Sequence, residues 1–585
     1  MILGKNFVLL ETLRRDKNNF RHLLFTDPVD IITCYQKKDI LHSFRKIDDY
    51  RQKGFYMAGF LSYELGYLLE DVLNQYDPKQ DYPLMWFGVY NKPRRLAKPL
   101  TPGNNDKYYL SRPILATNEN EYEKIISKIK DHIGNGDTYQ INYTTKYKFK
   151  FIGDIFTFYN RLKENQKVSY TALINHNNNY IVSLSPELFF RTDKNGLISV
   201  KPMKGTAGRD LPADWLPQDE KNISENVMIV DMLRNDLGRL CQPGTVKVSR
   251  LFDVEEYETL WQMTSTIKGK LIPRIRSLEI IKSLLPCGSV TGAPKINSMK
   301  IIHSLEKEPR NIYTGAIGYW GPDDQSIFNV AIRTLNLKKS GGRKYDGEMG
   351  VGGGIVYDSL ANEEYKECRI KAQFLFRSAP DFSLIETMLC TDGKIKYLSR
   401  HLQRLKSSSQ YFNIPCNITA FKKVVKQYAA PLAGRLRLRL LLNAAGEISL
   451  EHLPVITDKS TQRHVVLSRH KTNSKDPFLY HKTTLRKLYD SEYRKHANAD
   501  CRDVIFRNEK NEITEGAISN IFIRKNGSYY TPPLGCGLLA GIERQAMMKR
   551  LKAKEKILYL NDLKKAEEII LTNSVRGAAK VTLMT

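Results

Sequence analysis

The sequence has no apolar run long enough to cross a bilayer, and charged side chains interrupt the short apolar patch within residues 1–16. We therefore expect neither a signal peptide nor a membrane anchor, and a cytoplasmic location. The eight cysteines are scattered, with no Cys-x-x-Cys pair and no histidine spacing typical of zinc. They are predicted to be reduced thiols that fill the core. The chain also lacks internal repeats and low-complexity linkers.

Acidic residues are too few to balance the basic ones: 63 Asp and Glu against 91 Lys and Arg give a net charge of +28. The basic residues are spread along the chain, interleaved with acids, and form no arm or clustered stripe. This pattern indicates a general lysine bias and no nucleic-acid site. The charge still favours encounter with a small dianion. With 585 residues, 41% of them hydrophobic, the chain is long enough for two to four globular domains.

The sequence predicts one domain boundary, at residues 377–381. Before it, residues 363–376 have helical apolar spacing; after it, residues 382–390 form an apolar strand that leads into a turn at Asp392-Gly393. We predict one domain over residues 1–378 and another over 379–585, with an α+β fold class overall. The first part mixes strand-like stretches and amphipathic helices.

Three segments of the first part have an amino-acid composition that is unusual for an exposed surface. Residues 201–208 form a Gly-rich turn with a lysine after a strand, whose amides could approach an anion. Residues 224–236 read as a helix with Ser224 as its cap. Residues 352–354 are three glycines ahead of a helix on which Glu364 and Glu367 share one face. Each segment alone has an ordinary structural explanation, but converging carboxylates would suit Mg²⁺.

Together these segments resemble the chorismate-utilising enzymes, over about residues 120–375 and in the family's order. The matching motifs include Ser185-Pro186-Glu187, residues 201–206 and residues 288–295. The resemblance implies a two-layered α/β sandwich that binds chorismate. It also implies that Glu187 is a general acid, because hydroxide is a poor leaving group. The remaining roles carried over are the Mg²⁺ ligands Glu225, Glu364 and Glu367, and the substrate-binding residues Tyr313, Arg333, Thr206, Gly352, Gly353 and Gly354.

The residue types at two positions distinguish family members that catalyse different reactions. Family members that add water have a lysine at the position of Gln140, and a neutral amide cannot take that proton. Lys204 stands where anthranilate synthases have alanine; in aminodeoxychorismate synthases this lysine attacks C2 of chorismate before ammonia adds at C4. The resemblance therefore implies ammonia addition at C4. A histidine found in many family members is Gln262 here, and its role is left open.

The second part resembles the fold-type IV pyridoxal-phosphate enzymes, which include branched-chain and D-amino-acid aminotransferases and aminodeoxychorismate lyase. A Gly-rich turn before a helix, a lysine and an acid suit that cofactor. The resemblance implies a domain of two subdomains in which Lys482 is the catalytic lysine that attaches the cofactor, and Glu515 pairs with its ring nitrogen. The phosphate would be held by Arg404, Gly541, Ile542 and Thr572. Relatives often have threonine after the isoleucine, where this chain has Glu543.

The motifs of the second part do not separate a lyase from an aminotransferase. The fusion favours a lyase that converts aminodeoxychorismate into 4-aminobenzoate and pyruvate, for folate synthesis. An anthranilate or aminodeoxychorismate synthase fused to an aminotransferase is the alternative within enzymes, and a basic binding protein with decayed sites is another class. No Gly-x-Cys-x-Gly turn of a glutaminase is present, so a separate glutamine amidotransferase subunit is predicted as a partner. The resemblance also implies a homodimer through the second domain.

Overall fold

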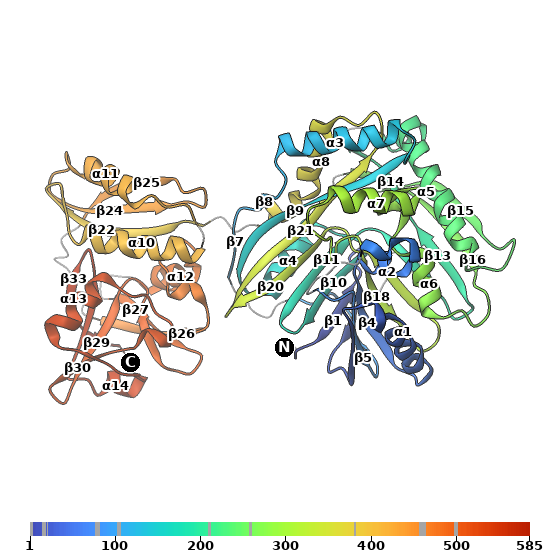
Figure 1. Ribbon diagram of the computed structural model, residues 1–585. Coiled ribbons are helices and arrows are strands. Elements are labelled where there is room, and N and C mark those ends of the chain that lie inside the picture. Colours follow the sequence, from blue (N-terminus) through green and yellow to red (C-terminus); the bar gives the residue numbers. More distant parts are fainter. Residues whose placement is uncertain are drawn as a thin grey trace. The chain divides into compact units, whose positions relative to one another are not determined.

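The computed structural model describes residues 4–14, 19, 21–76, 82–101, 107–208, 212–256, 260–378, 382–412, 414–455, 464–496 and 501–584. Its contacts divide the chain into two units (Figure 1). The first comprises Met1–Asn104, Pro113–Phe151 and Ile155–Ser378, and the second comprises Asn105–Arg112, Ile152–Asp154 and Ala379–Thr585. Residues 379–381 of the predicted domain boundary lie outside the described residues. Both units mix helices and strands, so the α+β class is confirmed.

One sheet of the first unit contains the glycine-rich strand β21. Its order is β17-β9-β21-β20-β11-β10-β1-β2-β6, with β8 also paired to β9. These strands are β1 (Phe7–Glu11), β2 (Leu23–Phe25), β6 (Arg94–Arg95), β8 (Ile114–Leu115), β9 (Gln140–Gly153), β10 (Tyr170–His176), β11 (Asn179–Ser185), β17 (Gly292–Ala293), β20 (Thr334–Gly341) and β21 (Lys344–Ile355). Every pairing recorded along this sheet is antiparallel where its register is given, as at β20–β21.

The other sheet of the first unit contains the strand of Lys204. Its order is β14-β16-β13-β12-β19-β18-β4-β5-β3, with β15 paired to β16. These strands are β3 (Asp30–Cys34), β4 (Tyr56–Leu61), β5 (Met85–Tyr90), β12 (Leu188–Thr192), β13 (Leu197–Lys201), β14 (Met203–Gly208), β15 (Lys247–Glu256), β16 (Leu260–Lys270), β18 (Ala316–Trp320) and β19 (Ser326–Val330).

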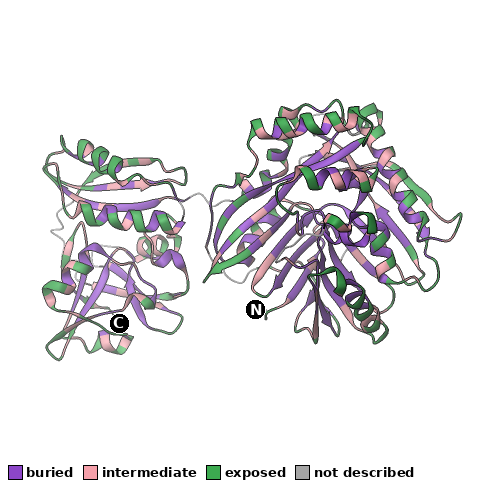
Figure 2. Cartoon of the chain, viewed as in Figure 1, coloured by how far each residue is buried: buried purple, intermediate pink, exposed green. Residues whose placement is uncertain are grey.

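The two sheets of the first unit pack on each other through a shared apolar core. Phe25 and Ile174 of the first sheet join Trp86 and Ile317 of the second in one buried cluster, and burial of such side chains is the main stabilising contribution. A second cluster lies between the second sheet and helices α1, α5 and α6. Figure 2 shows the buried residues concentrated on the strands. The predicted two-layered sandwich is therefore confirmed.

The helices of the first unit are α1 (Lys37–Gln52), α2 (Leu65–Leu69), α3 (Glu119–Gly134), α4 (Ile155–Asn165), α5 (Glu220–Gly238), α6 (Ser277–Leu284), α7 (Lys295–Leu305), α8 (Ala361–Lys371) and α9 (Gln373–Phe376). The prediction that Ser224 caps α5 is wrong. Asp219 is the cap, and its carboxylate accepts a hydrogen bond from the Asn222 amide. The helix therefore begins earlier, and Glu225 lies beyond its first turn.

The second unit contains two sheets, as expected for two subdomains. One has the order β23-β22-β24-β25, and the other β28-β27-β26-β33-β32-β29-β30-β31. The strands are β22 (Leu384–Thr391), β23 (Lys394–Ile395), β24 (Arg435–Leu442), β25 (Ile448–Pro454), β26 (His464–Thr472), β27 (Cys501–Asn508), β28 (Ile513–Gly516), β29 (Asn520–Lys525), β30 (Ser528–Thr531), β31 (Lys554–Glu555), β32 (Glu568–Asn573) and β33 (Gly577–Leu583). The predicted Asp392-Gly393 turn joins β22 to β23, and both residues have positive φ.

The helices of the second unit are α10 (Leu398–Phe412), α11 (Ile418–Ala429), α12 (Lys487–His496), α13 (Ile542–Leu551) and α14 (Leu560–Lys564). Helix α10 packs on β22 through a buried cluster that includes Leu402, Leu405 and Met388. Residues 481–484 precede α12, which begins at Lys487. Among the described residues, no helix has both the length and the apolarity needed to span a bilayer.

Candidate active sites

The first site is arranged around the glycines of β21. A Cβ atom on Gly350 would overlap the Tyr313 ring, and one on Gly353 would lie 2.9 Å from the Glu364 carboxylate. On Gly354 it would overlap the Gln140 amide and lie 3.2 Å from Lys204 Nζ. A side chain at any of these three glycines would therefore displace the group beside it. The strand brings together several residues that the sequence singled out, from elements far apart in the chain.

Lys204 is held by contacts to the backbone of its own strand, β14. Gln262 Nε2 donates a 2.8 Å hydrogen bond to the Gly205 carbonyl oxygen. Asn226 Nδ2 is 3.4 Å from the Lys204 carbonyl oxygen, and its Oδ1 accepts a 2.7 Å bond from Ser265. Gln262, whose role the sequence left open, therefore fixes the β14 backbone next to Lys204. The prediction of a Gly-rich turn here is wrong, because residues 203–208 form this strand. A neutral amide does this without adding a charge near the ammonium.

Glu187 is a buried acid with one side-chain partner. Ser289 Oγ donates a 2.7 Å hydrogen bond to Glu187 Oε1, and the Cys287 thiol is 3.3 Å from the same hydroxyl. Burial raises the pKa of Glu187 to about 7, although the Ser289 bond and the Lys204 charge oppose the rise. An acid with this pKa is partly protonated near neutrality, as a general acid requires.

Gln140 is buried, at 2% exposure, and neither its amide nitrogen nor its amide oxygen has a hydrogen-bond partner among the described residues. An unsatisfied buried amide costs free energy. Its position beside Gly354 and Lys204 leaves both atoms available to a bound molecule.

Two further predicted substrate-binding residues are Arg333 and Thr206. Arg333 lies between β19 and β20 with a positive φ of 50°, and its carbonyl oxygen accepts a hydrogen bond from the Leu184 amide. The backbone of Thr206 pairs with Gln262 in the sheet, whereas the Thr206 side chain lies outside the described residues. The roles of both residues stay predictions.

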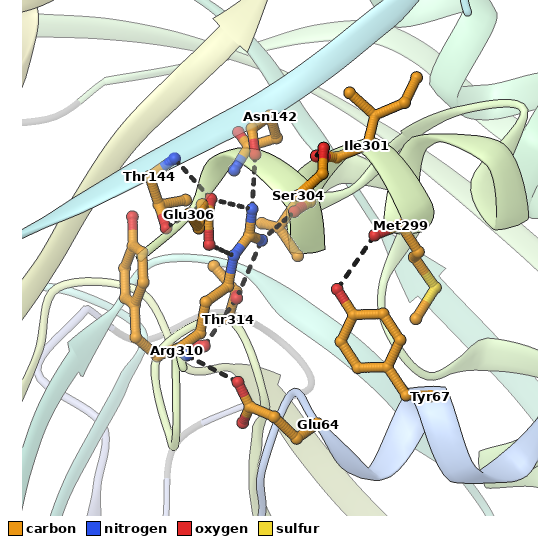
Figure 3. Close-up of polar contacts among 12 residues, drawn as sticks. Glu64, Tyr67, Asn142, Thr144, Met299, Ile301, Ser304, Glu306, Arg310 and Thr314 are labelled. Carbon is orange, nitrogen blue, oxygen red and sulfur yellow. Dashed lines mark hydrogen bonds and ion pairs between the residues drawn. The ribbon is translucent and has the colours of Figure 1, made fainter. Parts of the chain in front are cut away.

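A buried ion pair that the sequence did not single out supports this site (Figure 3). The Arg310 guanidinium donates to both carboxylate oxygens of Glu306, at 2.9 and 2.7 Å. It also donates to the carbonyl oxygens of Val290 and Asn142, at 2.8 and 2.6 Å. Glu306 in turn accepts bonds from the amide and hydroxyl of Thr144. This network fixes β9 and the loop that carries Ser289 relative to each other.

The second site contains a partly buried lysine, Lys482, just before α12. Burial, and after it the Arg404 charge, lower the pKa of Lys482 to about 7. An amine with this pKa is substantially neutral near pH 7, which is what attack on a carbonyl requires. The Ile385 amide donates to the Lys482 carbonyl oxygen at 2.8 Å, which ties this segment to β22.

The buried carboxyl of Glu515 forms the opposite end of this site. Burial raises the pKa of Glu515 to about 8. Its Oε2 accepts bonds from Asn520 Nδ2 at 3.1 Å and from the Leu539 amide at 3.2 Å, and the Tyr489 hydroxyl is 3.4 Å from Oε1. A cationic partner would stabilise the ionised form of this carboxyl.

The predicted phosphate-binding residues gather at the start of α13. Gly541 is the N-cap, without a side-chain cap, and a Cβ there would overlap the Asn520 amide oxygen. Thr572 Oγ1 is buried and has no partner among the described residues. Arg404 donates to the Ala540 carbonyl oxygen at 3.2 Å and is bound by both carboxylate oxygens of Glu386, at 2.9 and 2.7 Å. Such a helix start favours anions.

Comparison with known families agrees with this geometry. The chorismate binding enzyme family matches residues 6–377. The chain belongs to this family. The class IV aminotransferase family matches residues 383–584, so this chorismate binding enzyme carries a class IV aminotransferase domain fused after its first domain.

Its relatives include synthases of two kinds. An aminodeoxychorismate synthase of Arabidopsis thaliana is 36% identical over 285 residues, which are 47% of this chain and 30% of the relative. Aminodeoxychorismate synthase component 1 of Salmonella typhimurium is 35% identical over 42% of this chain and 55% of its own length. Anthranilate synthase component 1 of Saccharolobus solfataricus is 31% identical over 60% and 85%. The chain thus spans about a third of the length of the plant relative.

A solved structure supports the fold of the first domain. Anthranilate synthase component I of Streptococcus pneumoniae has a TM-score of 0.52 and 26% identity, over 64% of this chain and 92% of that one. The likeness extends across almost the whole of that component, which agrees with the two-sheet sandwich found here.

Chorismate binding enzymes typically use Mg²⁺, and part of the predicted ligand set fits it. Glu364 and Glu367 lie close enough that the Glu367 charge contributes, after burial, to the raised pKa of Glu364. The described residues contain no group of three or more side chains placed to hold a metal, so the predicted trio with Glu225 is not preformed. A carboxylate pair is still sufficient, because Mg²⁺ usually keeps water and substrate ligands.

Class IV aminotransferases typically use pyridoxal phosphate, and the second site fits that group. The partly neutral Lys482, the buried carboxyl of Glu515 and the Thr572 hydroxyl each match one part of the cofactor. The Thr572 hydroxyl has no partner among the described residues. Arg404 and the amides after Gly541 would hold its phosphate. Glu543 departs from this pattern, since a buried carboxylate follows Ile542.

Proposed function

We propose that the chain makes 4-aminobenzoate from chorismate in two steps, for folate synthesis. The first domain replaces the 4-hydroxyl of chorismate with an amino group, and the second eliminates pyruvate from the aminated product. The observation that supports the first step best is the placement of Lys204 Nζ, beside Gln140 and Gly354 and within the field of Glu187. The relatives named aminodeoxychorismate synthase favour the same chemistry.

In the first step, Lys204 forms a bond from Nζ to C2 of chorismate while the C4–O bond breaks. Glu187 gives its proton to the departing hydroxyl, which leaves as water. Ammonia then bonds to C4 and the C2–Nζ bond breaks, so that Lys204 is regenerated. The Gln140 amide is available to orient the incoming ammonia or the departing water, since it has no partner among the described residues. Glu364 and Glu367 would hold Mg²⁺, which would bind the substrate's ring carboxylate.

In the second step, bound pyridoxal phosphate would withdraw electrons from C4 of the aminated product. Lys482 removes the C4 proton, which its lowered pKa allows near neutrality. The enolpyruvyl group then leaves as pyruvate and the ring becomes aromatic, which makes the elimination strongly favourable. Glu515 would hold the cofactor's ring nitrogen in its protonated form, and that ion pair would compensate for burial of the carboxylate.

The partner and assembly follow from the same proposal. The relatives named component 1 act with a glutamine amidotransferase, and we propose a separate subunit of that kind as the ammonia source, with free ammonium as its substitute in vitro. A homodimer through the second domain and a cytoplasmic location complete the proposal.

The test is to incubate the purified chain with chorismate, Mg²⁺, ammonium and pyridoxal phosphate, and to identify the aromatic product by chromatography. We expect 4-aminobenzoate and pyruvate in equal amounts. Anthranilate would refute the assignment of Lys204 and support the second candidate, an anthranilate synthase component, which the Saccharolobus relative favours. An aminated product that accumulates without pyruvate, but is consumed when a keto acid is added, would indicate an aminotransferase.

A further inference from the structure

A buried carboxylate lies where the second site is expected to bind an anion. Glu543 is in the first turn of α13, directly after Ile542, and is 5% exposed. A carboxylate this close to the start of the helix competes with any phosphate for the same positive helix end. Two like charges held together in a buried site also repel each other. Glu543 therefore needs a compensating charge if α13 is to hold a phosphate.

Lys396 supplies that charge from a different element. Its Nζ is 3.0 Å from Glu543 Oε2, and its side chain is 39% exposed whereas that of Glu543 is 6% exposed. Lys396 lies between β23 and α10, and its amide donates to the Leu389 carbonyl oxygen at 2.9 Å. The ammonium also lies 4.7 Å from the centre of the Tyr397 ring. The lysine is thus held at its backbone and along its side chain.

The pair connects two helices that both contribute to the phosphate end of the site. Lys396 comes just before α10, which carries Arg404, and Glu543 is on α13, whose first amides face the same end. Arg404 already donates to the Ala540 carbonyl oxygen at 3.2 Å. The Lys396–Glu543 ion pair is a second link between the same two segments, through side chains.

We infer that Lys396 is a positioning residue of the cofactor site, which neutralises Glu543 so that α13 and Thr572 can hold a phosphate. This inference rests on the proposed cofactor of the second domain. Where the resemblance leads us to expect a threonine, this chain has the Glu543 carboxylate, whose charge Lys396 cancels.

The competing explanation is that Glu543 only stabilises the start of α13 through the helix dipole, and that Lys396 is a surface ion-pair partner. Such a pair contributes little to stability. That explanation predicts that loss of Lys396 leaves the affinity for the cofactor unchanged. The two explanations therefore differ in a binding measurement that needs no catalysis.

The experiment compares the full-length chain with Lys396→Met, Lys396→Arg, Glu543→Thr and the double variant Lys396→Met with Glu543→Thr. Lys394→Met is the matched control, because this lysine is two residues away and is exposed. Each protein is freed of cofactor, and the dissociation constants of pyridoxal phosphate and of pyridoxal are measured by equilibrium dialysis. The melting temperature of each cofactor-free protein is recorded to detect misfolding.

We expect Lys396→Met to weaken pyridoxal phosphate binding by about tenfold or more, because an unpaired buried charge remains beside the phosphate. Pyridoxal, which has no phosphate, should bind all variants alike. Lys396→Arg, Glu543→Thr and the double variant should bind pyridoxal phosphate within about threefold of the native chain, because each leaves no unpaired carboxylate.

Native affinity of Lys396→Met for pyridoxal phosphate would refute the inference, as would a double variant no better than Lys396→Met. A Lys396→Met chain that has lost affinity for pyridoxal to the same extent would also refute it, since the effect would not be at the phosphate. Failure of the native chain to bind pyridoxal phosphate at all would instead overturn the proposed function, and the inference with it.

Discussion

The hydrogen bond from Ser289 to Glu187 should set the pH range in which the first domain works. In Ser289→Ala the Glu187 carboxylate loses its only recorded side-chain donor, at 2.7 Å. A hydrogen bond to a charged group stabilises it by about 1.5–3 kcal/mol. Since one pKa unit corresponds to about 1.4 kcal/mol, the pKa of Glu187 should rise by about 1 to 2 above its value of about 7.

The sign of the effect follows from the role of Glu187. The proposed general acid must be protonated, so the rate should fall as pH rises through its pKa, and the variant should keep its rate to a higher pH. The assay is amination of chorismate at each pH, with free ammonia held constant rather than total ammonium. Ser185→Ala is the control, because the Ser185 hydroxyl bonds to backbone atoms of Glu187 and Val330, and no bond from it to the Glu187 carboxylate is found among the described residues. An alkaline limb that stays in place, or moves to lower pH, would refute the reasoning.

Three further changes test other parts of the two sites. Lys204→Ala should abolish aminated product while the melting temperature stays native, measured by chromatography and thermal unfolding; residual amination at native rate would exclude the covalent step. Lys482→Ala should let the aminated product accumulate without pyruvate, and the protein should lose the visible absorbance of bound cofactor. Gly354→Ala places a Cβ atom against Gln140 and 3.2 Å from Lys204 Nζ, so the KM for chorismate should rise about tenfold or more, whereas Gly238→Ala, in open space at the end of α5, should not change it.

Much of the first domain's site could be predicted from the sequence, because its residues lie in short motifs with fixed spacing. The glycines of β21, the lysine of β14 and the carboxylates of α8 each lie in one contiguous segment, and the structure brings the glycines and Lys204 together as expected. The two-layer arrangement was also expected, but only from the resemblance to the chorismate-utilising enzymes, not from a local pattern of the strands.

What the sequence did not reveal are the contacts between segments. Ser289 and Glu187 are 102 residues apart, and Arg310 reaches Asn142 across 168 residues, so no local pattern indicates either pair. The cap of α5 was misassigned because Ser224 and Asp219 are both good cap residues, and only the structure shows that the helix begins at the earlier one. The three-carboxylate magnesium site was inferred from resemblance, and the fold alone does not preassemble it.

The choice between lyase and aminotransferase in the second domain depends on what must enter its site. An aminotransferase needs a second reactant, a keto acid, to take up the amino group, whereas elimination needs only the aminated product. Lys482 and Glu515 would serve both reactions, because each requires proton removal next to the amine and a protonated ring nitrogen. The amine that we propose as the product of the first domain, however, becomes an aromatic ring when it loses pyruvate, and that gain is available only to elimination. Pyruvate release from the complete chain with no keto acid present would therefore identify the second domain as a lyase.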